Sequence, residues 1–229
     1  AGEGVAFKFA WALLRVAVIK ESAFLASLLD LAALGTIADV VPLAQENRIL
    51  AVRGLTQLNQ RQRLGLKHLA DVAKLPEKIT VEHVHFALAP RINAAGRLEH
   101  ARQAFELLLT ADAEVAENLA KEINAINIRR QGIGGEIKEA VFSQLTTESV
   151  AAERIVVLSG DNWHPGVIGI VASQVVDRYF RPAVLIGVYD KVGRGSARSL
   201  AGINIFKLLE SCADLFNTFG GHAGAAGFE

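Results

Sequence analysis

Two glycine-rich stretches near the end of the chain carry side chains that could handle a phosphate group. Residues 220–227 read GGHAGAAG, around His222, and residues 193–199 read GRGSARS, with two arginines and two serines. Small residues let backbone N–H groups approach an anion, and an arginine guanidinium binds phosphate through two parallel hydrogen bonds. Each stretch also has the composition of a tight turn, so one alone is weak evidence for a site.

A third stretch repeats this chemistry. Residues 90–97 read PRINAAGR and place Arg91 and Arg97 on either side of Asn93. No acidic residue occurs from position 83 to position 98, or from 191 to 209. Three such stretches in a chain of zero formal net charge favour phosphate binding, with Ser196 and Arg198 among the candidates in the second.

The histidines suggest different roles. His222 has only small neighbours, so its ring could donate to a phosphate or take part in acid-base chemistry. His164, in NWHPGVIG, comes at a turn before a helix and beside Trp163. A base-stacking or phosphate site is one interpretation, and helix capping or packing is another. The HVH run at 83–85 lies in a helical pattern, where its two rings face apart rather than forming a metal pair.

The acidic residues do not form a catalytic set. Two-metal phosphoryl chemistry needs several carboxylates and imidazoles that converge on the ions, and the sequence contains no Asp-x-Asp and no His-His pair. The best single candidate is Asp39 in GTIADVVPL, where a loop leaves an apolar stretch. An aspartate there can also be a helix cap, so we expect little catalysis by this chain alone.

The first part of the chain has the apolar spacing of helices. We predict helices over 5–19, 22–34, 45–58 and 112–145, one that Thr80 caps, and one after a loop at 90–96. We expect Gly35 to break the second helix. The third has Ile49, Val52 and Leu55 as its apolar face. In the long helix, QGIGGEI predicts a bend or an altered sequence, because each interior glycine costs about 1 kcal/mol.

The character changes after position 149. Residues 154–159 and 182–188 are short, rich in β-branched residues and bounded by turn residues, which predicts strands. A helix separates them and another covers 204–216, where we expect Cys212 to be a small core residue. These elements predict an α/β fold with a partly parallel sheet.

Composition sets the remaining limits. The 229 residues are 51% hydrophobic with one cysteine, which excludes a disulfide framework and fits a reducing cytoplasm. No apolar run has the length of a membrane span, and the start is not a signal peptide. The chain begins with Ala and contains no Met, so we expect a piece of a longer protein or an altered sequence.

Several runs, in this order, resemble the RecJ family of single-stranded-DNA-specific exonucleases in the DHH phosphoesterase superfamily. They are LLDLAALGTIADVVPL, NRIL, APRINAAGRLEHA, WHPGVIGIVAS, RP, GRGSARSL and FGGHAGAAG. The resemblance implies a DHH lobe that holds Mn²⁺ or Mg²⁺, a connecting helix, and a DHH-associated lobe of helices and mixed sheet that grips nucleic acid. The corresponding ranges are 1–44, 45–59 and 60–229.

The resemblance also assigns roles to residues. Asp39 matches a metal ligand, and His222 matches a histidine that reaches toward the scissile phosphate. The other matches are to positions that hold phosphates: Arg91, Asn93, Arg97, Ser196, Arg198, Gly220 and Gly221. The Asp-x-Asp and Asp-His-His motifs of the family are absent, QGIGGEI departs from its helix pattern, and Gly224 stands where a larger apolar residue is common.

The implied activity is removal of nucleotides from the 5′ end of single-stranded DNA by metal-assisted attack of water, in DNA repair and recombination. Single-stranded DNA is the expected partner, with a single-strand-binding protein and a recombination helicase as further partners. Two alternatives stay open: a phosphodiesterase for short oligonucleotides or cyclic dinucleotides, and a non-catalytic strand-holding replication factor.

Overall fold

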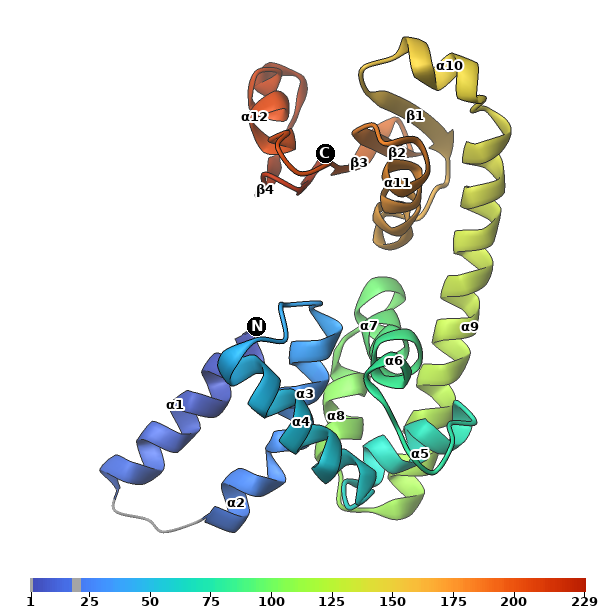
Figure 1. The fold of residues 1–229 in the computed structure, drawn as a ribbon. Helices are drawn as coiled ribbons and strands as arrows, with labels where there is room; N and C mark the ends of the chain where they lie inside the picture. Colours follow the sequence, from blue (N-terminus) through green and yellow to red (C-terminus); the bar gives the residue numbers. More distant parts are fainter. Residues whose placement is uncertain (1, 18–21) are drawn as a thin grey trace. The chain divides into compact units, whose positions relative to one another are not determined.

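The computed structural model describes residues 2–17 and 22–229 (Figure 1). The chain forms two compact units, Ala1–Ile128 and Arg129–Glu229. Helix α9, Ala113–Ser143, begins in the first unit and continues into the second. It is continuous through Gly132, Gly134 and Gly135, so the three glycines of QGIGGEI do not interrupt it.

The described part of the first unit is helical. Its elements before α9 are α1 (Gly2–Val16), α2 (Ser22–Ser27), α3 (Leu29–Ala38), α4 (Gln45–Asn59), α5 (Leu64–Val72), α6 (Val81–His83), a π-helical turn (Val84–Leu88), α7 (Ala89–Leu98) and α8 (Arg102–Leu109). Their apolar sides enclose a core that includes Leu69, Leu88 and Leu107. Thr80 caps α6 as predicted, since its hydroxyl accepts from the His83 N–H. The predicted end of the first helix, residues 18 and 19, lies outside the described residues.

Two expectations about α3 and α4 were wrong. Helix α3 continues through Gly35 and ends at Ala38, because Gly35 is buried where the Glu3 side chain packs against it. In α4 the buried residues include Ala51 and Gly54, whereas Ile49 is 61% exposed. A Cβ on Gly54 would lie 2.1 Å from the Leu29 carbonyl oxygen. The buried side of α4 thus combines Leu50 and Leu58 with the small residues Ala51 and Gly54, which let α3 come close.

The predicted loop at 90–96 is also a helix. Pro90 is the second residue of α7, which follows the π-helical turn Val84–Leu88 without a gap, so the helical run from Val81 to Leu98 includes this proline. Ala94 and Ala95 are fully buried on the inner side of this helix. The proline therefore does not end the helical run, and the arginines of PRINAAGR lie on a helix rather than in a loop.

The second unit contains a five-stranded mixed sheet. After α10 (Thr147–Ala152) come β1 (Val156–Asp161), α11 (Pro165–Tyr179), β2 (Ala183–Tyr189), β3 (Val192–Arg198), α12 (Ile205–Glu210), β4 (Phe219–His222) and β5 (Ala225–Phe228). The strand order is β1-β2-β3-β5-β4, with β1 and β2 parallel and the other pairs antiparallel. The predicted α/β class and the partly parallel sheet are confirmed.

Both glycine-rich stretches lie mainly in strands, and the turn interpretation holds only for Ala223 and Gly224, which join β4 to β5. GRGSARS lies in β3, and GGHAGAAG forms the β4–β5 hairpin. Phe228 explains one glycine, because a Cβ on Gly195 would lie 2.0 Å from the Phe228 ring. Since the glycines admit neighbouring rings and backbone, packing favours a strand where local composition indicates a turn.

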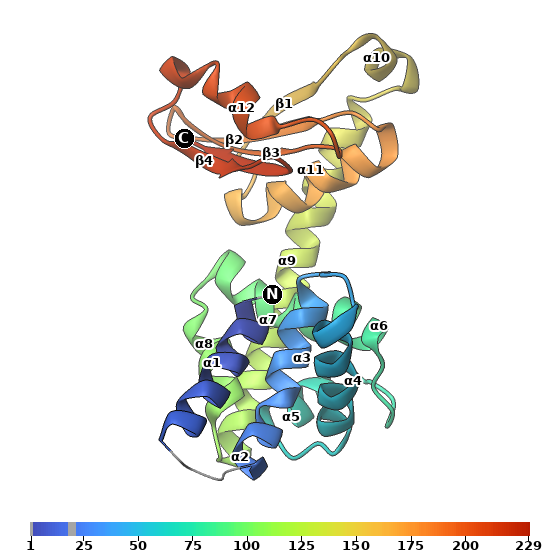
Figure 2. The same cartoon turned by 60° about the vertical axis from the view of Figure 1, so that its left-hand side comes forward.

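Helices α11 and α12 cover opposite faces of the sheet (Figure 2). On one face, Ile205 and Leu209 of α12 pack against Val184, Ala197 and Ala226. The other face receives α11, which packs on β2 and β3. Ser196 and Arg198 flank the buried Ala197 along β3, so they point to the α11 face.

Cys212 is exposed, which corrects its assignment to the core. Helix α12 ends at Glu210, and a single 3₁₀ turn, Ala213–Leu215, follows it. The predicted helix over 204–216 is therefore interrupted just where Cys212 lies. Among the helices that the structure describes, none has the length and apolarity needed to cross a membrane.

Candidate nucleic-acid interface

The α11 face of β3 presents a row of alternating polar side chains. Arg194, Ser196 and Arg198 occupy every second position, so all three point to this face. Arg198 Nη1 donates to Ser196 Oγ at 2.9 Å and to the Ala197 carbonyl at 2.8 Å. Ser196 and Arg198 thus form one hydrogen-bonded pair.

Helix α11 leaves room for that pair through a glycine. A Cβ on Gly169 would lie 2.5 Å from Arg198 Nη2 and 2.8 Å from Ser196 Oγ. These distances are well inside van der Waals contact. The position of the guanidinium therefore depends on the absence of a side chain at Gly169.

The β4–β5 hairpin brings the second glycine-rich stretch to the same face. Arg198 pairs with Ala225, and Ala225 pairs with His222. Residues in one cross-strand row share a face, so His222 lies two strand spacings from Arg198, roughly 10 Å between Cα atoms. Ser196 is related to Gly220 in the same way, through Gly227. The fold brings together five of the predicted residues: Ser196, Arg198, Gly220, Gly221 and His222.

The outer edge of this face is open. Gly220, Gly221 and His222 are all exposed. The His222 Nδ1 accepts from the Gly224 N–H at 3.2 Å, so the neutral ring carries its proton on Nε2 and can donate it outward. Gly221 has φ of 154°, and a Cβ there would lie 2.4 Å from the Ala225 carbonyl oxygen. Glycine is needed at this point of the hairpin.

His164 caps α11 beside this face. Its Nδ1 accepts from the Gly166 N–H at 3.1 Å, which makes the capping interpretation correct. Burial, and then the charge of Arg129, lower the pKa of His164. Its neighbour Trp163 is only 8% exposed and packs over Gly160, so the indole is not available for base stacking.

The phosphate candidates of the first unit lie on α7. Arg91 is half-buried. Its Nε donates to Asn124 Oδ1 at 2.9 Å and its Nη1 to the Ala87 carbonyl at 3.0 Å. Burial lowers the pKa of Arg91. Asn93 and Arg97 are exposed and lie one turn apart on the same helix, so both are on the same side of it.

Asp39 is an exposed residue at the C-terminal end of α3. The next residue, Val40, has φ of 54°, a conformation that is strained for a β-branched residue. Among the residues that the structure describes, no group of three His, Cys, Asp or Glu side chains could hold a metal ion. Asp39 can supply one ligand, and the described residues alone do not fit a divalent-metal centre.

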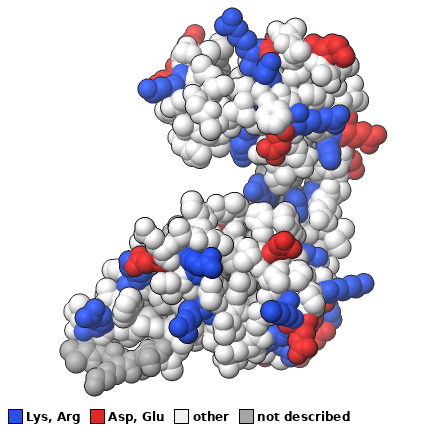
Figure 3. Space-filling model, viewed as in Figure 1, with Lys and Arg blue, Asp and Glu red and all other residues white. Residues whose placement is uncertain are grey.

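Charges are mixed on the surface. Figure 3 shows basic and acidic side chains interspersed on the face that it presents, in keeping with the zero formal net charge. On the face that Figure 3 presents, the basic side chains do not gather into one large patch. The signal of this site is the shared strand face that holds Arg198.

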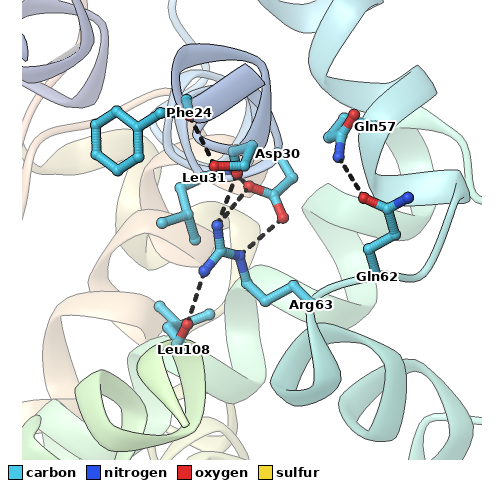
Figure 4. Close-up of polar contacts among 8 residues, drawn as sticks. Phe24, Asp30, Leu31, Gln57, Gln62, Arg63 and Leu108 are labelled. Carbon is cyan, nitrogen blue, oxygen red and sulfur yellow. Dashed lines mark hydrogen bonds and ion pairs between the residues drawn. The ribbon is translucent and has the colours of Figure 1, made fainter. Parts of the chain in front are cut away.

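Sequence patterns did not reveal one buried ion pair. Arg63 Nε donates to Asp30 Oδ2 at 2.8 Å, and other guanidinium atoms donate to the carbonyls of Ser27 and Leu108 (Figure 4). Asp30 is 4% exposed. This pair fastens the start of α3, the helix that ends at Asp39, to the end of α8. The acid and the base are 33 positions apart, so no local pattern relates them.

Comparison with known proteins relates the chain to one family. Residues 148–229 match the model of the DHHA1 domain. Over 99% of its length, the chain is 44% identical to the single-stranded-DNA-specific exonuclease RecJ of Bacillus subtilis and 40% identical to that of Thermus thermophilus. Along nearly its whole length the chain is thus homologous to part of the RecJ proteins. It spans 28% and 32% of the lengths of these two RecJ proteins.

Solved RecJ structures match the fold as well. The Mg²⁺ complex of Thermus thermophilus RecJ matches 98% of this chain with a TM-score of 0.87 and 39% identity, over 34% of its own chain. Its Mn²⁺ complex matches with a TM-score of 0.86 over 33% of that chain. Those RecJ proteins are thus bound to divalent metal ions. The DHHA1 match includes all five strands, and with them Ser196, Arg198 and His222.

Proposed function

We propose that this chain forms the strand-holding part of a RecJ-type exonuclease that degrades single-stranded DNA from the 5′ end. Ser196 and Arg198 would hold a backbone phosphate, and His222 would donate a hydrogen bond to the phosphate that is cleaved. Gly220 and Gly221 would let that phosphate approach the backbone. Arg91, Asn93 and Arg97 would contact phosphates from α7, and His164 would border the strand at α11.

One observation carries this proposal. Arg198 and His222 share a cross-strand row on one sheet face, and the hairpin edge of that face is exposed. A guanidinium gives a charge-assisted hydrogen bond to a phosphate, and an exposed imidazole N–H gives a second donor. Gly220 and Gly221 are exposed on this edge and have no side chains. The backbone of β4 is therefore accessible to an extended polyanion.

The catalytic part of the proposal concerns a whole RecJ-type protein. A divalent ion, Mn²⁺ or Mg²⁺, would activate water there, with Asp39 as one ligand. The proposed lobes are 1–44 for the end of the metal-binding domain, 45–59 for the connecting helix and 60–229 for the nucleic-acid-binding domain. Since Asp39 is a single ligand, we expect this 229-residue chain to bind single strands without cleaving them.

The broader role follows from the same relationship. The named relatives are exonucleases specific for single-stranded DNA, which favours a long single strand over a cyclic dinucleotide as substrate. A role in cytoplasmic DNA repair and recombination is part of the proposal, with a single-strand-binding protein and a recombination helicase as partners. A strand-holding factor without catalysis would differ by binding without turnover even in the whole protein.

Salt dependence tests the proposal directly. Fluorescence anisotropy with a labelled single strand gives the affinity at several salt concentrations, and its logarithm falls with a slope of about 0.7 per neutralised phosphate. Arg198→Gln should reduce that slope by about 0.7. Arg154→Gln is the control, because Arg154 is exposed and precedes β1. Equal slopes for Arg198→Gln and the unchanged chain would contradict the proposal.

A further inference from the structure

A cavity of about 470 Å³ lies in the second unit, within the size range of small-molecule sites. It opens beside the turn that joins β2 to β3. The residues that line it are His164, Pro165, Tyr189, Asp190, Val192, Arg194 and Glu229. Apart from His164 and Arg194, the sequence analysis assigned no chemistry to any of them.

This cavity continues the polar row of β3. Arg194 points to the same face as Ser196, and Arg194 Nε donates to Glu229 Oε2 at 2.8 Å. Four residues of strand separate Arg194 from Arg198, which is roughly 13 Å. A strand whose phosphate contacts Arg198 can therefore extend one of its neighbouring nucleotides over the cavity.

The charges of the lining do not suit a phosphate. Arg194 is already paired with Glu229, and Asp190 adds a second carboxylate. The lowered pKa of His164 keeps that ring neutral near pH 7. Two carboxylates against one guanidinium repel an anion and accept hydrogen bonds from a neutral group that has N–H donors.

The remaining lining suits a flat ring. Tyr189 and Pro165 offer apolar surfaces on which a base can stack, and Val192 adds an aliphatic wall. Burial raises the pKa of Tyr189, so its phenol stays protonated. Asp190 and Lys191 have φ of 43° and 70°, which is the two-residue turn that fixes a tight hairpin. The Asp190 carboxylate is therefore held at a defined point of the rim.

We propose that this cavity binds one nucleobase of the single strand whose phosphate contacts Ser196 and Arg198, and that its carboxylates favour bases with an exocyclic amino group. Adenine, cytosine and guanine carry such a group and thymine does not. His164 Nε2, which bears the proton because Nδ1 accepts from Gly166, donates to a ring nitrogen or carbonyl of the base. This inference rests on the proposed single-strand function.

Anisotropy with oligonucleotides of equal length, made of dA, dC or dT, tests the inference on the full 229-residue chain. Tyr189→Leu keeps an apolar side chain but removes the ring, and should weaken dA and dC binding about five- to tenfold, the lower part of the range for one stacked base. Its salt slope should stay unchanged because no phosphate contact is lost. Phe180→Leu is the matched control, since Phe180 is 68% exposed at the end of α11 and outside the cavity.

Asp190→Asn provides a second, gentler variant, because asparagine also tolerates positive φ. It should reduce the preference for dA and dC over dT by up to about tenfold, the effect of losing a charged acceptor. If Tyr189→Leu does not fold, as circular dichroism would reveal, Asp190→Asn alone decides the question.

The possible failures are distinguishable. Two outcomes contradict the proposed function and this inference together: the chain does not bind single strands, or Arg198→Gln leaves the salt slope unchanged. A third outcome overturns the base cavity alone. Arg198→Gln reduces the salt slope as expected, but the folded Tyr189→Leu and Asp190→Asn variants bind all three oligonucleotides like the unchanged chain. Loss of affinity in Tyr189→Leu with a constant salt slope, together with loss of base preference in Asp190→Asn, supports it.

Discussion

Replacing Gly169 by alanine should separate stability from single-strand binding. Gly169 lies inside α11, where alanine is favoured over glycine by about 1 kcal/mol. The new Cβ would lie 2.5 Å from Arg198 Nη2, 2.8 Å from Ser196 Oγ and 3.2 Å from Arg198 Cζ. Ordinary contacts are about 3.5–4.0 Å, so the guanidinium must move by about 1 Å.

That movement should cost little folding stability but should weaken single-strand binding. Arg198 Nη2 is the end of a flexible side chain, so it can rotate away at small cost. We therefore expect Gly169→Ala to unfold at the same free energy as the unchanged chain, or up to about 1 kcal/mol higher. A displaced guanidinium loses a charge-assisted hydrogen bond, typically about 1.5–3 kcal/mol, which corresponds to a loss of about tenfold or more in single-strand affinity.

Denaturant unfolding and fluorescence anisotropy measure the two effects on one preparation. Gly135→Ala in α9 is the matched control, because a Cβ there meets nothing within 4 Å. It should gain similar stability and keep its affinity. Unchanged affinity in Gly169→Ala would refute the reasoning that this guanidinium position matters. A loss of several kcal/mol in stability would refute the claim that the pair can move freely.

Three further outcomes follow from the structure. Gly195→Ala should destabilise the second unit by about 1–3 kcal/mol, seen as a lower Tm, because its Cβ would lie 2.0 Å from the Phe228 ring; an unchanged Tm would contradict this packing. Asp30→Ala should cost about 3–5 kcal/mol in denaturant unfolding, because it leaves Arg63 without its buried partner, whereas a cost below 1 kcal/mol would mean that water replaces the carboxylate. The pKa of His164 is lowered in the fold, so the unfolded chain binds the proton first as the pH falls. Stability should therefore decrease as the pH drops below about 6.5 toward the lowered pKa. His164→Asn can still cap α11 and should flatten this part of the stability profile, whereas a profile identical to that of the unchanged chain would contradict the assignment.

Local signals predicted many of the elements. Thr80 was identified as a cap because its hydroxyl serves the helix that directly follows. The strands near 156–161 and 183–189 were found because their β-branched runs are short and bounded by turn residues. The α/β class followed from these two strands and the helix between them.

Glycines account for most of the errors, and the reason is physical. Gly35, Gly54 and Gly195 each stand where another part of the chain comes close, and such contacts are not visible in local composition. A run with several glycines therefore resembles a turn even when a helix or strand needs the space. The strand pairing that places Arg198 and His222 in one row also depends on contacts between distant parts of the chain, so local composition did not predict it.

The sequence predicted those residues of the candidate site whose chemistry is visible locally. Arginine and histidine among small residues identified the stretches that meet on the sheet face, since their chemistry is local. Tyr189 and Glu229 were missed because they meet Arg194 only through the hairpin and the pairing of β3 with β5. The roles of Arg91, Asn93 and Arg97 remain predictions.

Amide chemical shifts test the central claim most directly. Titrating the ¹⁵N-labelled chain with a short single-stranded DNA should shift the backbone amides of Ser196, Arg198 and Gly220–His222, and fewer amides on the α12 face. Shifts that cluster instead around Phe216 and Phe219, or no shifts at saturating DNA, would contradict a phosphate-binding face built from β3 and the β4–β5 hairpin.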